Sequence, residues 1–196
     1  VSFYHHGDFS DVDKEQCLNK INSRINSSSD FIRKADFIFI SPGTSWVYEH
    51  NSERIIVSNC HKIPDRQFYR YKLSIQQTIE SLEEIITILN ELNKNIHIIF
   101  TISPIRHWKD GAFQNQVSKS TLILAIHELL KKHDKLSYFP SYEIVMDELR
   151  DYRFYSDDMI HLSNVAIEYI WERFCDTWFA KHTLAYMNEI NKVKKG

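Results

Sequence analysis

Ile96-His97-Ile98-Ile99-Phe100-Thr101-Ile102 is an apolar run that stops at Ser103-Pro104. A short continuous run bounded by turn residues is typical of a strand buried on both faces of a parallel sheet. Phe37-Ile38-Phe39-Ile40, which stops at Ser41-Pro42-Gly43, has the same character. Leu136 to Phe139, just before a proline, predicts a third strand.

Segments of helical periodicity separate these strands. Apolar residues recur every three or four positions at Leu18, Ile21 and Ile25 after a start at Ser10 to Asp13, at Ile75, Ile79, Leu82, Ile86 and Leu89, at Leu122, Ala125, Ile126 and Leu129, and at Ala166, Ile170, Phe174 and Trp178 after Ser163. A polar break at Asn26 to Ser29 follows the first helix, and Ile55 to Val57 suits a short strand in a hairpin. The alternation of strands and helices predicts right-handed crossovers and a parallel α/β sheet.

The composition describes one globular domain. The 196 residues are 43% hydrophobic and carry a net charge of −2, so a nucleic-acid partner is not expected. Cys17, Cys60 and Cys175 are widely spaced, which indicates reduced thiols, as in the cytoplasm, and no disulfide. The chain has no run of 18 apolar residues that predicts a membrane span. Its histidines lack the tight spacing of a zinc site, so we expect no metal or other cofactor.

Three polar segments follow predicted strands or precede the last helix. Ligands of parallel α/β sheets bind beyond the carboxyl ends of the strands. This rule places Gly43 to Trp46, Ser103 to His107 and the Asp158 to His161 turn on one rim of the sheet. We therefore expect the functional site where these three segments meet.

Asp158-Met159-Ile160-His161 has the spacing of an acid–base pair. An Asp carboxylate can accept the proton of one imidazole nitrogen and leave the other nitrogen free as a base. By itself the spacing more often reflects a capping Asp beside a surface His. Its position on the predicted rim favours the pair.

The other two segments offer ligand contacts. Gly43, Thr44 and Ser45 could donate amide and hydroxyl hydrogens to a developing oxyanion, or could form an ordinary strand-to-helix turn. Arg106 could bind a carboxylate or phosphate bidentately, or could sit in a structural ion pair. His107 could contact substrate or orient a neighbour.

Longer stretches carry a family resemblance. The relevant stretches are Ser41 to Glu49, Asn59 to Lys62, Thr101 to His107 with Asp110-Gly111, Tyr138 to Glu143, Asp147 to Tyr155 and Asp158 to His161. With them the chain resembles the GSCFA-domain family of bacterial proteins from His5-His6 to about Phe179. That family is similar to the SGNH (GDSL-like) hydrolases.

The resemblance implies a three-layer α/β/α, flavodoxin-like parallel sheet and an esterase or deacetylase acting on a carbohydrate or acyl ester. In it Asp158 orients His161, His161 is the general base, and Gly43 lies at an oxyanion-hole motif. The hydrolase domain would span residues 1–180, and residues 181–196 would form a C-terminal helix and basic tail. The expected partner is a small-molecule or glycan ester; the oligomeric state is not predicted.

Two departures from the family pattern shape the expectations. Ser45 and Trp46 stand where the oxyanion motif has Asn and Asp, which favours a rival interpretation, a non-catalytic module that binds a glycan or a protein. The Gly-Ser-Cys-Phe-Ala motif, with its nucleophilic serine, does not occur in the 196 residues. The resemblance implies that the motif and two strands precede Val1. We therefore expect these residues alone to be inactive, with Phe37 to Ile40 at an open sheet edge beside an exposed apolar patch.

Overall fold

The computed structural model describes residues 2–195. Its centre is a parallel sheet with strand order β1-β5-β6, formed by Phe37–Ile40, His97–Thr101 and Leu136–Phe139. The registers pair Ile38 with Ile98 and Ile98 with Leu136. The three predicted main strands are therefore confirmed as an α/β arrangement, with β5 in the middle.

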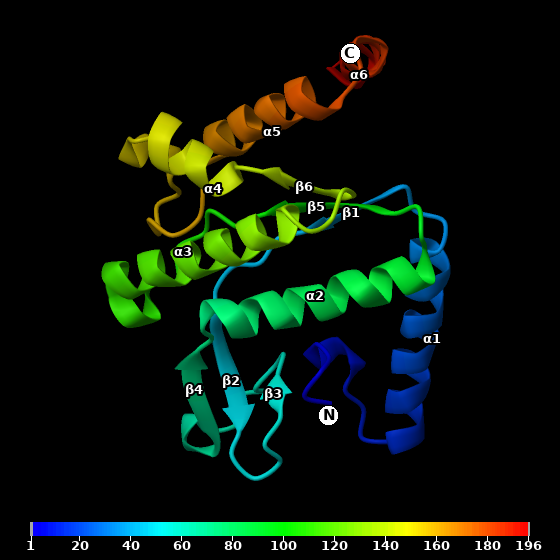
Figure 1. Cartoon of the computed structure of the whole chain (residues 1–196), viewed down its shortest axis with the longest axis vertical. Helices are drawn as coiled ribbons and strands as arrows, with labels where there is room; N and C mark the ends of the chain where they lie inside the picture. The colour runs from blue at the N-terminus through cyan, green and yellow to red at the C-terminus, as the bar shows by residue number, and fades with distance from the viewer. Residues whose placement is uncertain (1, 196) are drawn as a thin grey trace.

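Helices cover both faces of this sheet. The elements are α1 (Lys14–Ile32), α2 (Ile75–Leu92), α3 (Gly111–Leu130), α4 (Ser141–Glu143), α5 (Asn164–Trp178) and α6 (Lys181–Lys195). Figure 1 shows α2 and α3 on one side of the sheet and α5 on the other. Ile98 and Phe100 of β5 pack in the cluster formed with α2 and α3, whereas Ile99 belongs to a second cluster on the α5 side. The alternation of the strand thus produces three layers.

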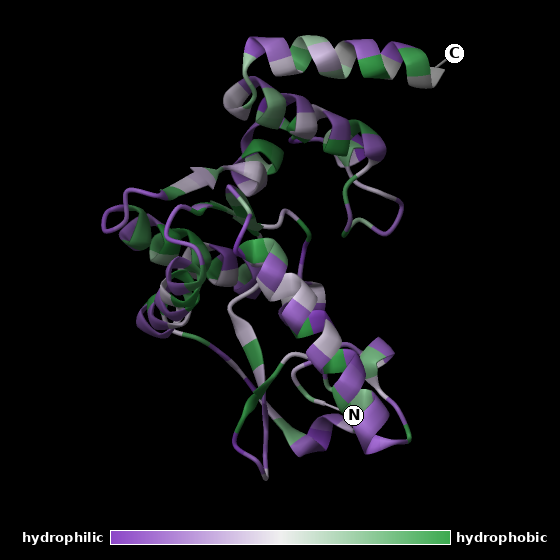
Figure 2. Cartoon of the chain, turned by 90° about the vertical axis from the view of Figure 1, so that its right-hand side faces the viewer, coloured by the Kyte–Doolittle hydropathy of each residue, from purple (hydrophilic) through white to green (hydrophobic). Residues whose placement is uncertain are grey.

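Short single turns complete the chain. They are η1 (Gly7–Phe9), η2 (Asp65–Gln67), η3 (Trp108–Asp110), the π-helical η4 (Ile144–Glu148) and η5 (Tyr152–Phe154). The predicted helices begin near their capping residues, since Ser74 caps α2 with a capping box and Ser163 caps α5. Figures 1 and 2 place α6 at one end of the molecule, beyond α5.

A second, antiparallel sheet follows the first strand. Its order is β3-β2-β4, with β2 at Trp46–His50, β3 at Ile56–Val57 and β4 at Phe68–Lys72. The hairpin strand expected near Ile55 to Val57 is confirmed, while β2 and β4 were not anticipated. Because β2 begins at Trp46, the segment after β1 leads to a strand, and the strand-to-helix interpretation of Gly43 to Ser45 is wrong.

The first helix differs from its expected pattern. Asp13 caps α1, but the helix continues through Asn26 to Ser29, so the predicted polar break is wrong. Ile21 is buried, whereas Leu18 and Ile25 are exposed. Figure 2 shows α1 as a mostly hydrophilic helix with isolated hydrophobic residues. The polar residues from Asn26 to Ser29 can remain in solvent while their backbone groups keep the hydrogen bonds of the helix, so a polar stretch does not end α1.

Strand β1 is the edge of the parallel sheet within the described residues, because it pairs only with β5. Its side chains facing α5, Phe37 and Phe39, are 56% and 53% exposed. Burial on both faces is therefore the wrong prediction for this strand, and the expected open edge is confirmed.

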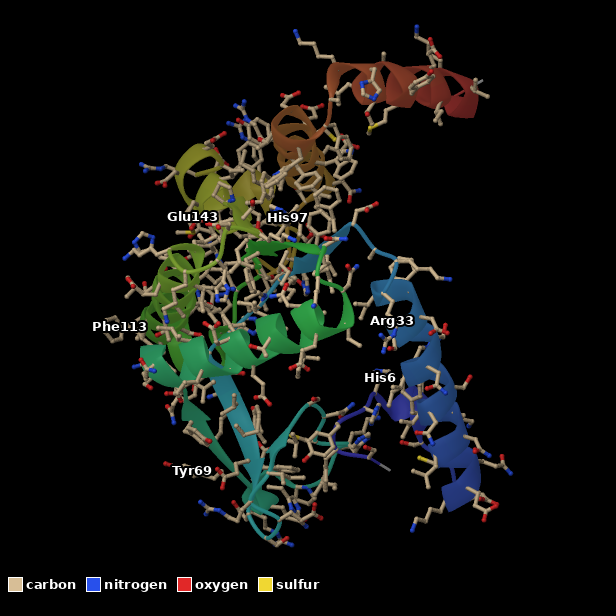
Figure 3. All side chains as sticks on the ribbon, turned by 45° about the vertical axis from the view of Figure 1, so that its right-hand side comes forward. His6, Arg33, Tyr69, His97, Phe113 and Glu143 are labelled. Carbon is tan, nitrogen blue, oxygen red and sulfur yellow. The ribbon has the colours of Figure 1, made fainter. Side chains whose placement is uncertain are left out.

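An apolar groove of about 490 Å³ adjoins this edge, with Phe39, Phe139, Trp171 and Phe174 among its walls. This groove confirms the expected exposed apolar patch. Figure 3 shows side chains crowded around the parallel sheet and its flanking helices, while Tyr69 projects from the antiparallel sheet away from that core.

Candidate active site at the carboxyl edge of the parallel sheet

The inward stripe of α3 changes from apolar to polar towards the carboxyl edge of the sheet. Leu122, Ile126 and Leu129 fill the core, but Ser118 and Lys119, one turn earlier, are equally buried. The sequence-based prediction missed these two residues. A lysine three residues before Leu122 and seven before Ile126 occupies a core position of the same helix face, and this spacing was the available signal.

Lys119 joins the loops that follow β1 and β5. Only 1% of the residue is exposed. Its ammonium group donates to the carbonyl oxygen of Gly43 at 2.6 Å and to that of Ser103 at 2.5 Å. Burial lowers the pKa of Lys119 to about 8. The Ser103 N–H donates to Pro42 O at 3.1 Å, so the two predicted rim segments are in direct contact.

Ser45 faces inward and is 2% exposed. Its N–H donates to Ser118 Oγ at 2.7 Å, and its hydroxyl donates to the same oxygen at 3.1 Å. The Thr44 and Ser118 hydroxyls lie 3.0 Å apart. Ser45 is therefore engaged in fastening β2 to α3, and its donors do not face the rim.

His107 packs directly over Gly43. A Cβ at Gly43 would lie 2.9 Å from Nε2 of His107, so any other residue at this position would require the ring to shift. The His107 N–H donates to Asn115 Oδ1 at 2.9 Å, which ties the loop to α3. Burial, followed by the nearby charges of Lys119 and Arg70, lowers the pKa of His107, so the ring is neutral at neutral pH.

Asp158 and His161 form the hydrogen-bonded pair that their spacing in the sequence predicts. Asp158 Oδ2 lies 2.6 Å from His161 Nδ1, and Asp158 Oδ1 accepts the N–H groups of Ile160 and His161 at 2.9 Å each. The side-chain bond from His161, together with the backbone donors, lowers the pKa of Asp158 to about 2. Because an ionised carboxylate only accepts, the neutral form of the His161 ring carries its proton on Nδ1, which leaves the lone pair of Nε2 free.

The turn that holds this pair closes on itself. Met159 adopts a left-handed conformation with φ of 59°, and Ser156 N–H donates to His161 O at 2.8 Å. The side chains of His161 and Asp158 are 59% and 46% exposed. The imidazole is thus oriented by its own loop and remains accessible to a ligand.

Arg106 connects the turn to the rim. Its N–H donates to Ile160 O at 3.4 Å, and its guanidinium donates to Met159 O at 3.1 Å. The guanidinium carbon lies 3.8 Å from the centre of the Tyr155 ring. No ion pair of Arg106 is found in the described part of the chain, so the structural ion-pair interpretation is wrong. All three predicted segments are therefore linked, with the Ser103 to His107 loop in the middle.

A bidentate ion pair supports the rim from the antiparallel sheet. Arg70 Nη1 and Nη2 donate to the two carboxylate oxygens of Asp110 at 2.5 and 2.6 Å. The Arg70 guanidinium also lies 4.2 Å from the centre of the Trp46 ring. The Asp110 contact raises the pKa of Arg70, and the Arg70 contact lowers that of Asp110. This pair fastens β2 and β4 to the start of α3.

Two further features of residues 2–195 bear on the class of site. The described helices include no segment with the length and apolar character needed to cross a membrane. The described His, Cys, Asp and Glu side chains form no group of three or more that could hold a metal ion.

The fold and site together define an α/β protein with an accessible Asp–His pair and, among the described residues, an arginine without an ion-pair partner at the carboxyl edge of a parallel sheet. A family model gives the particular assignment. The model of the GSCFA family matches residues 1–174, and the chain belongs to that family. No curated protein matches the chain.

Proposed function

We propose that this chain carries the acid–base part of an SGNH-like serine ester hydrolase, an esterase or deacetylase acting on a carbohydrate or acyl ester. The observation that carries the proposal is the 2.6 Å contact between Asp158 and His161 in an exposed turn bonded to Arg106. Membership of the GSCFA family supports it. The nucleophile would be the serine of the Gly-Ser-Cys-Phe-Ala motif, which these 196 residues do not contain.

His161 is the general base in this proposal. The serine hydroxyl attacks the acyl carbon, and Nε2 of His161 takes its proton while Asp158 stabilises the imidazolium. The same proton then passes to the leaving alcohol, and water removes the acyl group by the reverse roles. A positioned base of this kind contributes roughly 10² to 10⁴ in rate.

The oxyanion would be bound by backbone amides. Since Ser45 N–H already donates to Ser118, the remaining candidates in the segment are the N–H groups of Gly43 and Thr44. Preorganised amides of this kind stabilise the tetrahedral intermediate because they need no rearrangement during the reaction. Arg106 and His107 are the proposed substrate contacts.

Ester hydrolysis by a chain that includes the motif tests the proposal. We expect p-nitrophenyl acetate turnover that falls by about 10⁴ in Asp158→Asn and in His161→Gln, whereas Asp157→Asn, the same charge change one residue away, leaves it unchanged. The 196 residues alone should give only background hydrolysis. Full turnover in the Asp158 and His161 variants would contradict the proposed base.

One observation favours a second candidate, a non-catalytic module that binds a glycan or a protein. Ser45, which stands at the oxyanion position, is buried and hydrogen-bonded to Ser118 rather than facing the rim. A fluorophosphonate probe separates the candidates, because it labels only a serine activated by a base. Labelling that depends on His161 supports the hydrolase, and a motif serine that stays unlabelled supports the binding module.

A further inference from the structure

A small cavity lies beside the Asp158–His161 turn. It measures about 220 Å³, and Arg106, Tyr152 and Tyr155 form part of its walls. Buried apolar side chains of Val145 and Leu149 form another part. Sites for whole small-molecule ligands usually measure about 300 to 1,000 Å³, so this cavity suits one substituent of a larger ligand.

Arg106 gives the cavity an unneutralised positive charge. The guanidinium has five N–H donors, and the described residues use one of them, on Met159 O. The guanidinium carbon lies 3.8 Å from the centre of the Tyr155 ring, a contact that restrains the group while its remaining N–H donors have no partner among the described residues.

The other charged groups of the cavity are already paired. Arg150 contacts Asp147 at 3.0 Å, and Asp151 lies 3.6 Å from Arg153. Because these charges offset one another, Arg106 dominates the electrostatic preference of the cavity. An anionic group is therefore favoured over a neutral or cationic one.

The position of Arg106 relates the cavity to the proposed chemistry. Arg106 bonds to Met159 and Ile160, the two residues between Asp158 and His161. An anion on its free edge would therefore sit beside the turn that presents the imidazole. The exposed ring of Tyr152 offers a flat apolar surface next to it, as sugar rings require.

We propose that this cavity binds the carboxylate of an acidic sugar, with Arg106 as the anion-binding residue and Tyr152 as the surface for the ring. The substrate class is then an ester of a glycan that contains uronic acid. That last step rests on the proposed hydrolase function, whereas carboxylate binding at Arg106 does not.

Binding without turnover tests the cavity. The 196-residue protein is titrated with glucuronic acid, with glucose as the neutral match, and followed by NMR signals of the Arg106 side chain and the Tyr155 ring. We expect saturable shifts with glucuronic acid only, weakened by added salt and at least about tenfold weaker in Arg106→Gln. Equal binding of glucose, or unchanged glucuronic acid binding by Arg106→Gln, would overturn the proposal.

Matched variants separate binding from folding. Arg33→Gln removes the same charge at the end of α1, which Figure 3 shows on the other side of the molecule from Glu143 of α4, and should leave binding unchanged. Arg106→Lys keeps the charge without the planar fork and should bind with intermediate affinity. The Nδ1 proton signal of His161 reports whether the turn persists in each variant.

A phosphate arm distinguishes the source of the anion. Glucose 6-phosphate binding more tightly than glucuronic acid would overturn the assignment to a carboxylate. Because none of these measurements involves hydrolysis, their failure would leave the proposed base untouched. Conversely, if a fluorophosphonate does not label the motif serine, the proposed ester substrate is refuted, but the proposed carboxylate site is not affected.

Discussion

Replacing Lys119 by Met tests the buried link between the two rim loops. The substitution keeps an unbranched side chain of similar reach in α3 but removes the donors to Gly43 O and Ser103 O. A carbonyl left unpaired and fully buried costs about 1 to 3 kcal/mol, and these two half-buried carbonyls should cost less than that each. The loss is opposed at neutral pH by removal of a buried charge, so the informative quantity is the change of the effect with pH.

The pKa of Lys119 fixes the sign and the size of that change. Its value falls from 10.5 to about 8 on folding. Between these two values the unfolded chain binds more protons than the folded one, so this residue makes the wild-type protein more stable as pH rises. A pKa difference of one between the two states corresponds to about 1.4 kcal/mol, so the gain from pH 7 to pH 10 is about 2 to 3 kcal/mol. The methionine of Lys119→Met does not titrate, so the cost of the substitution should grow by that amount.

Urea unfolding at pH 7, 8, 9 and 10, followed by tryptophan fluorescence, measures the effect. Ionisation of tyrosines and thiols occurs in both proteins and cancels in the comparison. Lys131→Met, which removes an exposed lysine at the other end of α3, should show no such trend. A cost of Lys119→Met that stays constant from pH 7 to pH 10 would refute the buried, charged lysine described above.

Three further outcomes follow from the geometry. Gly43→Ala should lower the free energy of unfolding by about 1 to 3 kcal/mol, because the added methyl group meets His107. Gly7→Ala, with open space around the new methyl group, should not lower it, and urea unfolding of both variants measures the difference. The Asp158 carboxyl should titrate near pH 2 in ¹³C NMR and return towards its ordinary 3.8 in His161→Ala, and an unchanged midpoint would contradict the pair. Phe39→Lys should reduce fluorescence of the hydrophobic dye ANS without changing stability by more than about 0.5 kcal/mol, and dye binding equal to wild type would argue against the exposed groove.

The sequence was sufficient for elements whose pattern is local. The period of Ile75, Leu82 and Ile86 identified α2, and Ser163 marked the start of α5. The continuous apolar run around Ile99 identified β5, which is buried on both faces because helices lie on each side. In these cases the local sequence is enough to predict the element, because the spacing of the apolar residues matches the spacing of the buried side chains.

Elements that depend on distant partners were harder to predict. The alternating exposure of β1 could not be read from Phe37 to Ile40, because it follows from which strands and helices lie beside that strand. Strands β2 and β4 mix charged and aromatic residues, such as Arg70 beside Trp46, and Arg70 pairs with Asp110, which lies 40 residues further along the chain. Ser45 was predicted to face the rim because it follows a predicted strand, but its hydrogen bonds to Ser118 on α3 turn it inward.

Two different packing clusters hold the parts of the candidate site in place. The Gly43 and Ser103 loops are held by Lys119 and Ser118, on the helix that packs against the large core cluster. The Asp158–His161 turn instead leads into a separate cluster through Leu162, which packs with Val145 and Ala166. Arg106 bonds across from the first part to the second. In the proposed hydrolase the base and the oxyanion donors must keep a fixed separation, so Arg106 would serve that geometry as well as the proposed anion. Lys119→Met should therefore disturb the NMR signals of Gly43 and His107 and leave the Nδ1 proton signal of His161 unchanged. Arg106→Gln should instead loosen the position of the Asp158–His161 turn and leave the contacts of Lys119 with Gly43 and Ser103 intact.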